Sequence, residues 1–227
     1  MIHRLSGKDH SVYTTAFLDF DGTILKSGEG VVNAVRYMFS RLDMSIPDEQ
    51  EMFKFVGPPI KHHMTSVYGM DALQAEKAYM LFREYYNDKG VYESYLYDGI
   101  TDVLEALRCS GQKLYIATCK QEPTLRDLLD KYEILDLFDD AFGAWHDQGI
   151  YDKTQVLQNG FRRIGGHPDH AVMVGDRYYD IEGGKAVGLD TAGVLYGYGD
   201  RNELSDAGAD YLLDNVEDIA ALLGGRL

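Results

Sequence analysis

Three segments of the chain run apolar and then turn abruptly polar. They are residues 14–25 (TTAFLDFDGTIL), 113–120 (KLYIATCK) and 170–180 (HAVMVGDRYYD). A short apolar run that ends at polar residues is typical of a strand buried on both faces of a parallel sheet. The pattern therefore predicts three strands whose carboxyl ends carry polar groups.

Helical patterns separate these strands. One helix is indicated by apolar residues at spacing i, i+3, i+4 and i+7 with a glycine as its predicted C-cap: Ile100, Val103, Leu104, Leu107 and Gly111. Further strands are predicted at about residues 190–195 and 210–213, and a last helix at about residues 216–223. This alternation predicts an α/β fold: a doubly wound parallel sheet with a Rossmann-like core.

Residues 26–95 break the alternation, because they hold helical patterns with no convincing strand between them. Their aromatic residues recur along one helical face, which we interpret as core packing. The Gly57-Pro58-Pro59 turn interrupts the segment. The sequence therefore predicts a helical insert at 26–95, while residues 1–25 and 96–227 together form the α/β core.

Composition and charge argue against a nucleic-acid-binding, membrane or secreted protein. The 227 residues include 22 Lys and Arg against 37 Asp and Glu, which gives a formal net charge of −15. That charge repels nucleic acid and anionic membrane surfaces, so neither is an expected partner. No apolar run approaches the ~18 residues of a membrane-spanning helix, and residues 1–11 lack the apolar stretch of a secretion leader. Cys109 and Cys119 cannot form a disulfide framework, so we expect a cytoplasmic protein.

The first predicted strand ends in two aspartates, Asp19 and Asp21. Residues two apart on a strand share a face, where two like charges are costly without a cation nearby. Gly22 and Thr23 follow, and a glycine lets the chain turn and expose backbone N–H groups suited to a phosphoryl oxygen. Taken alone, the pair is also compatible with aspartates that only cap a turn.

Further motifs follow in order: Thr118 ends a hydrophobic strand, Lys153 begins a helix, and Gly175-Asp176 precedes Asp180. Together with Asp19-Phe20-Asp21-Gly22-Thr23, this ordered set resembles the haloacid dehalogenase superfamily of phosphatases. The Gly57-Pro58-Pro59 turn, residues 97–100 and residues 118–120 look most like the phosphoglycolate phosphatase branch, in which the helical insert is a cap domain.

The resemblance implies a Mg²⁺-dependent phosphatase that hydrolyses a small phosphomonoester, such as phosphoglycolate or a nucleoside monophosphate. It makes Asp19 the nucleophile that forms an aspartyl-phosphate and Asp21 the general acid/base. Asp19, the backbone carbonyl of Asp21 and Asp176 would bind Mg²⁺, an ion that favours oxygen ligands. Asp180 would hold a metal-bound water or orient a neighbouring group.

The resemblance also assigns residues to the substrate, a small phosphorylated metabolite: Phe20, Thr118, Cys119, Lys120 and Lys153. Thr118 would donate a hydrogen bond to the phosphate, and Lys153 would pair with both the nucleophile and the transferring group. Many relatives have a small polar residue in place of Cys119, so its side-chain role stays open. Lys120 is predicted to meet an anionic leaving group, and Lys61 of the insert is a second candidate that is also compatible with a solvated helix lysine.

Three alternatives share parts of this pattern. A phosphomutase resembling beta-phosphoglucomutase has the same aspartates and the cap. The presence of Asp21 argues against a dehalogenase, whose chemistry does not need it, and the helical insert and the chain length argue against a phospho-accepting receiver module, which needs neither. The seven histidines show no zinc-ligand spacing, and we predict that they lie mainly at the surface.

Overall fold

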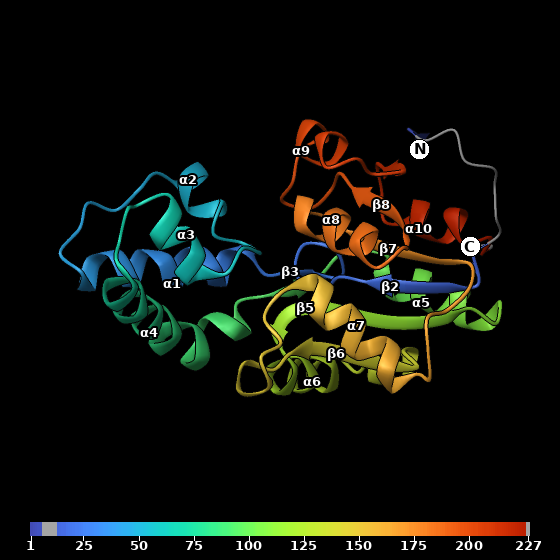
Figure 1. The fold of residues 1–227 in the computed structure, drawn as a ribbon, viewed down its shortest axis with the longest axis horizontal. Coiled ribbons are helices and arrows are strands. Elements are labelled where there is room, and N and C mark those ends of the chain that lie inside the picture. Colours follow the sequence, from blue (N-terminus) through green and yellow to red (C-terminus); the bar gives the residue numbers. More distant parts are fainter. Residues whose placement is uncertain (6–12, 226–227) are drawn as a thin grey trace. The chain divides into compact units, whose positions relative to one another are not determined.

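The computed structural model describes residues 1–5 and 13–225, so residues 6–11 of the polar N-terminal segment lie outside the description. The chain divides into two compact units. One contains Met1–Ile24 and Leu96–Leu227, and the other contains Leu25–Tyr95 (Figure 1).

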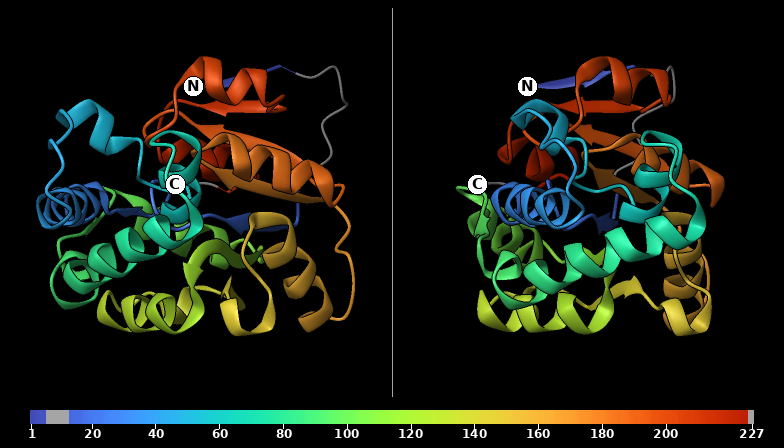
Figure 2. Two further views of the ribbon diagram at one scale, coloured as in Figure 1. Left: turned by 60° about the vertical axis from the view of Figure 1, so that its left-hand side comes forward. Right: turned by 90° about the vertical axis from the view of Figure 1, so that its left-hand side faces the viewer.

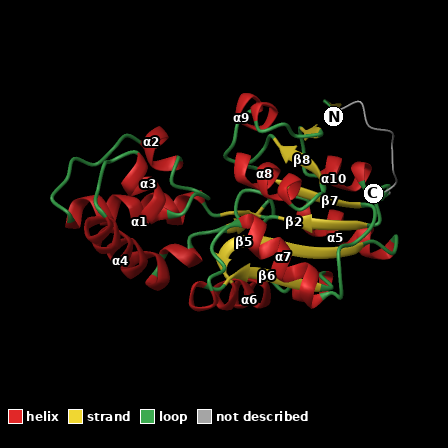
Figure 3. Cartoon of the chain, viewed as in Figure 1, coloured by secondary structure: helices red, strands yellow, loops and turns green. Residues whose placement is uncertain are grey.

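The larger unit is built on a seven-stranded sheet in the order β1-β9-β8-β7-β2-β5-β6 (Figure 3). The strands are β1 Ile2–Arg4, β2 Thr15–Leu18, β5 Lys113–Gln121, β6 Asp140–Ala144, β7 Ala171–Gly175, β8 Asp190–Val194 and β9 Tyr211–Leu213. All neighbouring strands run parallel except β1, which pairs antiparallel with β9. The predicted α/β class with a Rossmann-like sheet is confirmed.

Helices cover both faces of this sheet (Figures 1 and 2). They are α5 Ile100–Cys109, α6 Glu122–Lys131, α7 Lys153–Arg163, α8 Tyr178–Ala186, α9 Arg201–Asp206 and α10 Glu217–Leu222. Helices α7 and α8 pack against each other on one face, and α5 and α10 pack against each other on the other. Every residue of β2 and β7 is buried, as expected for central strands covered on both sides.

Two strands of this seven-stranded sheet were not predicted. The antiparallel edge strand β1 has three residues, of which His3 and Arg4 are polar, so no apolar run marks it. Strand β6 (DAFGA) is also short and contains a glycine. Its Phe142 nevertheless joins an aromatic cluster around Phe17, whose ring centre lies 6.4 Å from that of Phe142 and 5.4 Å from that of Phe161. Such contacts join residues that are far apart in the sequence, so the local hydrophobic pattern does not predict the strand that they stabilise.

The smaller unit is helical. It contains α1 Gly28–Arg41, α2 Glu49–Phe53, α3 Ile60–Ser66, α4 Ala72–Asp88, a 3₁₀ turn Gly90–Tyr92, and the short strand β3 Leu25–Lys26, which pairs with β4 Tyr95–Leu96. Helix α1 packs along α4 (Figure 2). Its apolar face is buried, and Gly30 meets Gly90 so closely that an added Cβ would lie 1.9 Å from the Gly90 carbonyl oxygen.

The prediction that histidines lie mainly at the surface is wrong for His63. Its side chain is buried on α3, three residues after Ile60, on the face that also buries Ile60. The imidazole centre lies 4.1 Å from the ring of Phe55 and 6.1 Å from that of Tyr68. An aromatic environment thus makes this histidine part of the core.

Within the described residues, no helix has both the length and the apolar character needed to cross a bilayer.

A charged cluster fixes α6 and α7 to the edge strand β6. The carboxylate of Glu122 accepts hydrogen bonds from Arg126 (2.9 Å), Arg163 (2.8 Å) and the indole N–H of Trp145 (3.0 Å). Burial opposes the ionisation of Glu122, but the hydrogen bonds from Arg126, Trp145 and the Gly143 amide outweigh it and lower its pKa.

Replacing Glu122 with Gln should lower the free energy of unfolding at pH 7 by about 2 kcal/mol, since the two guanidiniums keep partial solvent contact. Because the pKa of Glu122 is lowered in the folded protein, its ionised form contributes fully to stability when the pH is above the ordinary pKa of Glu. This contribution is lost as the pH falls through the pKa of the folded state. Urea unfolding from pH 7 down to pH 3 should therefore show the variant and the wild type converging. The exposed Asp127→Asn on the same helix is the control; an equal loss in both variants at pH 7 would contradict the assignment.

Candidate active site

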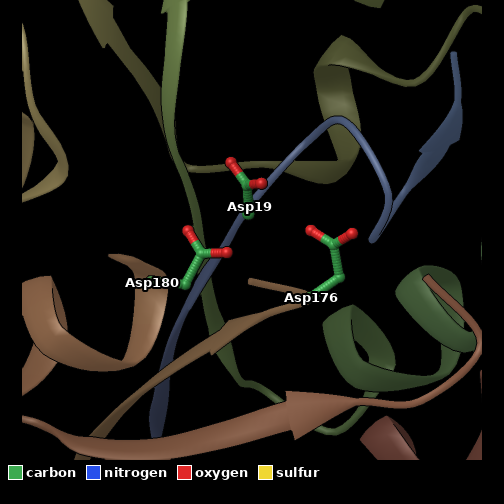
Figure 4. Close-up of side chains that lie close together, drawn as sticks. All are labelled: Asp19, Asp176 and Asp180. Atoms are coloured by element: carbon green, nitrogen blue, oxygen red, sulfur yellow. The ribbon is translucent and has the colours of Figure 1, made fainter. Parts of the chain in front are cut away.

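The predicted site residues of the core meet at the carboxyl ends of the central strands. Asp19 follows β2 directly, Thr118 lies in the last part of β5, and Asp176 follows β7. Carboxylate oxygens of Asp19, Asp176 and Asp180 all lie within 4.8 Å of one another, and all three side chains are buried (Figure 4). This is the crevice that a parallel sheet forms outside its strand ends.

Lys153 supplies the positive charge of this cluster. It is the first residue of α7, whose N-terminus is fixed by a capping box between Asp152 and Gln155. The ammonium Nζ lies 2.6 Å from Asp19 Oδ1 and 2.8 Å from Asp180 Oδ1, and only 1% of the side chain is exposed. Burial disfavours the charged form, but the carboxylates of Asp180 and Asp19 outweigh it and raise the pKa of Lys153. Lys153 is therefore a permanent cation.

One ammonium does not balance three buried carboxylates. Burial and then the charge of Asp19 raise the pKa of Asp180 to about 7, even with Lys153 in contact. Burial together with Asp180 and Asp19 raises the pKa of Asp176 well above its usual value. Burial and the neighbouring carboxylates together therefore disfavour the ionised forms of Asp176 and Asp180.

Asp176 has room for a further ligand. Its Oδ2 accepts a hydrogen bond of 2.8 Å from the Tyr198 amide, whereas the buried Oδ1 accepts none within the described residues. Three carboxylates with one unused buried oxygen form an oxygen-only donor set, which fits a hard divalent cation. The buried acidic triad is thus compatible with a metal site.

Asp21 lies apart from this triad and has a different partner. Lys120 Nζ is 2.9 Å from Asp21 Oδ2, with side chains 7% and 16% exposed, respectively. The other oxygen, Oδ1, is buried and accepts no hydrogen bond within the described residues. The structure therefore places Lys120, a predicted substrate residue, beside the second aspartate.

Thr118 and Lys120 approach the site through an irregular stretch of β5. Its pairing with β6 shifts register between Ala117 and Gln121. The amide of Lys120 donates a hydrogen bond of 3.3 Å to the hydroxyl Oγ1 of Thr118, and the Thr118 side chain is buried. A bulge of this kind redirects side chains at the end of a strand.

The other predicted substrate residues differ in what they offer. The side chain of Phe20 is fully buried in the core, which leaves its backbone for a ligand. Burial raises the pKa of the Cys119 thiol to about 12, so it is a neutral thiol at physiological pH and a poor nucleophile. Lys61, in the smaller unit, forms an ion pair with Glu76 and lies over the ring of Tyr79 at 4.7 Å.

The sequence reasoning missed the loop at residues 196–199 (YGYG), which contacts Asp176 through the Tyr198 amide. Its signal is two glycines alternating with tyrosines directly after β8, at the sheet edge where the aspartates lie. Gly22 also adjoins Asp176: its φ is 85°, and an added Cβ would lie 2.1 Å from Asp176 Oδ2. Only glycine fits at that position.

Residues 16–194 match the family model of the haloacid dehalogenase-like hydrolases. The chain belongs to this family. Among curated proteins, it is 31% identical over 192 residues to a 5'-nucleotidase of Pseudomonas aeruginosa, covering 85% of this chain and 87% of that protein. It is also 35% identical over 181 residues to the tyrosine-protein kinase PtkA of Mycobacterium tuberculosis, covering 80% of this chain and 62% of that protein.

Solved structures of haloacid dehalogenase-like proteins superpose on the whole fold. A crystal structure of a predicted phosphatase from Clostridium acetobutylicum has a TM-score of 0.88 and 33% identity, covering 93% of this chain and 98% of that one. A predicted phosphoglycolate phosphatase from Haemophilus somnus has a TM-score of 0.77 over 94% of this chain and 99% of that one, and at 19% identity this likeness concerns the fold. The predicted family is confirmed, and this haloacid dehalogenase-like hydrolase is a phosphatase.

Replacing Lys153 with Met should abolish phosphatase activity and lower the free energy of unfolding by about 3 kcal/mol or more at pH 7, because Asp19 and Asp180 then lose their buried counter-charge. Adding Asp180→Asn to this variant should restore part of the stability by removing one of the two carboxylates. Urea unfolding of both variants measures the effect, with the exposed Lys113→Met as control. A Lys153→Met protein as stable as the wild type would show that the ion pairs do not hold the site together.

Proposed function

We propose that the enzyme hydrolyses a small phosphomonoester through an aspartyl-phosphate on Asp19, with Mg²⁺ bound beside it. The observation that carries this proposal is the placement of Asp19 in contact with Lys153 and within the buried acidic triad, at the carboxyl end of the central strand β2. A carboxylate held in place by a fixed cation is suited to attack phosphorus.

In the first step, a carboxylate oxygen of Asp19 forms a bond to phosphorus and the bond from phosphorus to the leaving oxygen breaks. Asp21 gives its proton to that oxygen. In the second step, water attacks phosphorus, Asp21 takes its proton, and the bond between phosphorus and Asp19 breaks to release inorganic phosphate. Asp21 suits the proton transfers because it lies two residues from Asp19 and is more exposed, 16% against 3% for the side chains.

Asp19, Asp176 and the backbone carbonyl of Asp21 would hold Mg²⁺, an assignment supported by the oxygen-only donors and the unused Asp176 Oδ1. When bound, the ion offsets the negative charge of the phosphate and of the nucleophile. Asp180 fixes Lys153 through their 2.8 Å ion pair. The Thr118 hydroxyl and the Lys153 ammonium are the proposed donors to the phosphoryl oxygens.

The 5'-nucleotidase relative supports a nucleoside monophosphate as one candidate substrate, and phosphoglycolate is the other. We further propose that residues 26–95 act as a cap and that the enzyme works on small soluble metabolites in the cytoplasm, where its two free cysteines stay reduced. Phosphate release from a panel of nucleoside monophosphates, phosphoglycolate and hexose phosphates identifies the preferred ester.

As an alternative, the enzyme would transfer the phosphoryl group to an acceptor other than water. The sequence similarity to the tyrosine-protein kinase PtkA favours this alternative. A phosphomutase would transfer the group to a sugar. Stoichiometric release of inorganic phosphate with no phosphorylated sugar or tyrosine supports hydrolysis.

Asp19→Asn should reduce turnover of p-nitrophenyl phosphate to below a few per cent, because an amide cannot form the acyl-phosphate. Circular dichroism should remain native. The exposed Asp127→Asn, on α6, should retain full activity. Residual activity above that level in a sample shown by mass spectrometry to be free of deamidation would refute Asp19 as the nucleophile.

Asp21→Asn should slow hydrolysis of an alkyl phosphate by about 10²-fold or more, since the alkoxide then leaves without a proton. Formation of the aspartyl-phosphate from p-nitrophenyl phosphate should suffer less, because p-nitrophenolate is a good leaving group. Burst kinetics with both esters separate the two steps. Equal loss in the first step with the two esters would assign Asp21 to metal binding alone.

A further inference from the structure

The loop at residues 196–199 packs directly on Asp176. The amide of Tyr198 donates a hydrogen bond of 2.8 Å to Asp176 Oδ2. A Cβ added to Gly197 would lie 2.3 Å from Asp176 Cβ, and one added to Gly199 would lie 2.1 Å from the Asp176 carbonyl oxygen. Both distances are far below van der Waals contact, so the loop backbone comes this close only because these positions are glycine.

The same loop contacts the turn that follows β2. The Tyr196 hydroxyl donates a hydrogen bond of 2.9 Å to the backbone carbonyl of Thr23. A Cβ added to Gly197 would also lie 2.6 Å from the carbonyl oxygen of Gly22. The loop after β8 therefore joins the ends of β7 and β2, the two strands that carry Asp176 and Asp19.

The contacts restrain the Asp176 carboxylate on two sides. Gly22 lies against Oδ2, which the Tyr198 amide also binds, and Gly197 lies against Cβ. The one oxygen left without a hydrogen bond among the described residues is the buried Oδ1. Oδ2 already lies in the space that the missing Cβ of Gly22 leaves open, and rotation of the side chain would break its hydrogen bond to the Tyr198 amide.

We infer that residues 196–199 are positioning residues for Asp176: they fix its carboxylate so that Oδ1 is the oxygen presented to the cation. This inference rests on the metal site of the proposed function. Partners that orient a metal-binding carboxylate typically change metal affinity by 10- to 100-fold when they are altered. A loop that only completed the sheet edge would change stability and leave metal affinity alone.

Two variants and two matched controls separate these roles. Gly197→Ala places a methyl group against Asp176, whereas the control Gly193→Ala, on β8, places one 2.8 Å from the flexible side chain of Leu204. Tyr196→Phe removes the hydroxyl bonded to Thr23. Its control, Tyr13→Phe, removes a hydroxyl that donates a 2.8 Å hydrogen bond to Asp190 at the opposite end of the sheet.

The measurement is Mg²⁺ binding without substrate, taken from the rise in Tm as MgCl₂ is added to metal-free protein. Gly197→Ala should raise the apparent Kd for Mg²⁺ by tenfold or more, and Tyr196→Phe should raise it by about two- to fivefold, the scale of one hydrogen bond. Both controls should lower the metal-free Tm and keep the wild-type Kd.

Wild-type Mg²⁺ affinity in both loop variants would overturn the inference while leaving the proposed function intact. Equal weakening in the controls would also overturn it, because the effect would then be general destabilisation. If Gly197→Ala does not fold, the comparison of Tyr196→Phe with Tyr13→Phe decides. Absence of any Mg²⁺-dependent stabilisation in the wild type would overturn the proposed metal site and this inference with it.

Discussion

The active site depends on one buried ammonium, that of Lys153, held between the carboxylates of Asp19 and Asp180. Burying charges is costly, and an ion pair of this kind persists only where the chain fixes both partners. The parallel sheet supplies that rigidity by bringing the ends of β2 and β7 side by side, and the capping box of α7 sets the place of Lys153. Lys153 and Asp180 are closely packed against glycines. A Cβ added to Gly183 would lie 2.7 Å from Lys153 Cβ, and one added to Gly175 would lie 2.3 Å from the Asp180 carboxyl carbon. The fold itself thus fixes the positions of these groups, which is the condition for electrostatic stabilisation of a transition state.

The central part of the fold could be predicted from the sequence because buried parallel strands produce unbroken apolar runs. Phe17 and Val174 lie in such runs, and the polar residues that follow mark the strand ends where Asp19 and Asp176 lie. Strands β1 and β6 could not be predicted, since three residues at an edge and five residues including a glycine carry too little pattern. His63 was misplaced for a related reason, because its burial depends on the rings of Phe55 and Tyr68 supplied from outside its own helix.

The motifs of the site could be read from the sequence, and so could the pairing of Lys153 with Asp19, which the resemblance implied and the structure contains. Other partners could not. Lys120 was predicted to meet an anionic leaving group because it lies two residues from Thr118, and its 2.9 Å ion pair with Asp21 could not be foreseen from that spacing. The contribution of Tyr196 and Gly197 was likewise hidden, because it consists of a hydroxyl, a missing Cβ and backbone contacts to residues far away in the chain. The local sequence pattern shows which types of side chain lie at a strand end. Contacts with residues far away in the chain determine which atoms of those side chains can bind a ligand.

The two aspartates of the first motif show how surroundings can divide labour between identical side chains. Asp19 is almost fully buried, and its Oδ1 contacts an ammonium that itself has 1% exposure, so its position is fixed. Asp21, two residues later, keeps 16% exposure and meets Lys120 through Oδ2 alone. In the proposed mechanism, the immobile carboxylate of Asp19 suits the nucleophile, and the greater solvent contact of Asp21 suits the proton transfers to the leaving group and from water. In the proposed mechanism, a phosphate dianion entering this site adds negative charge next to both aspartates. The ammonium groups of Lys153 and Lys120, which contact Asp19 and Asp21 respectively, offset part of that charge.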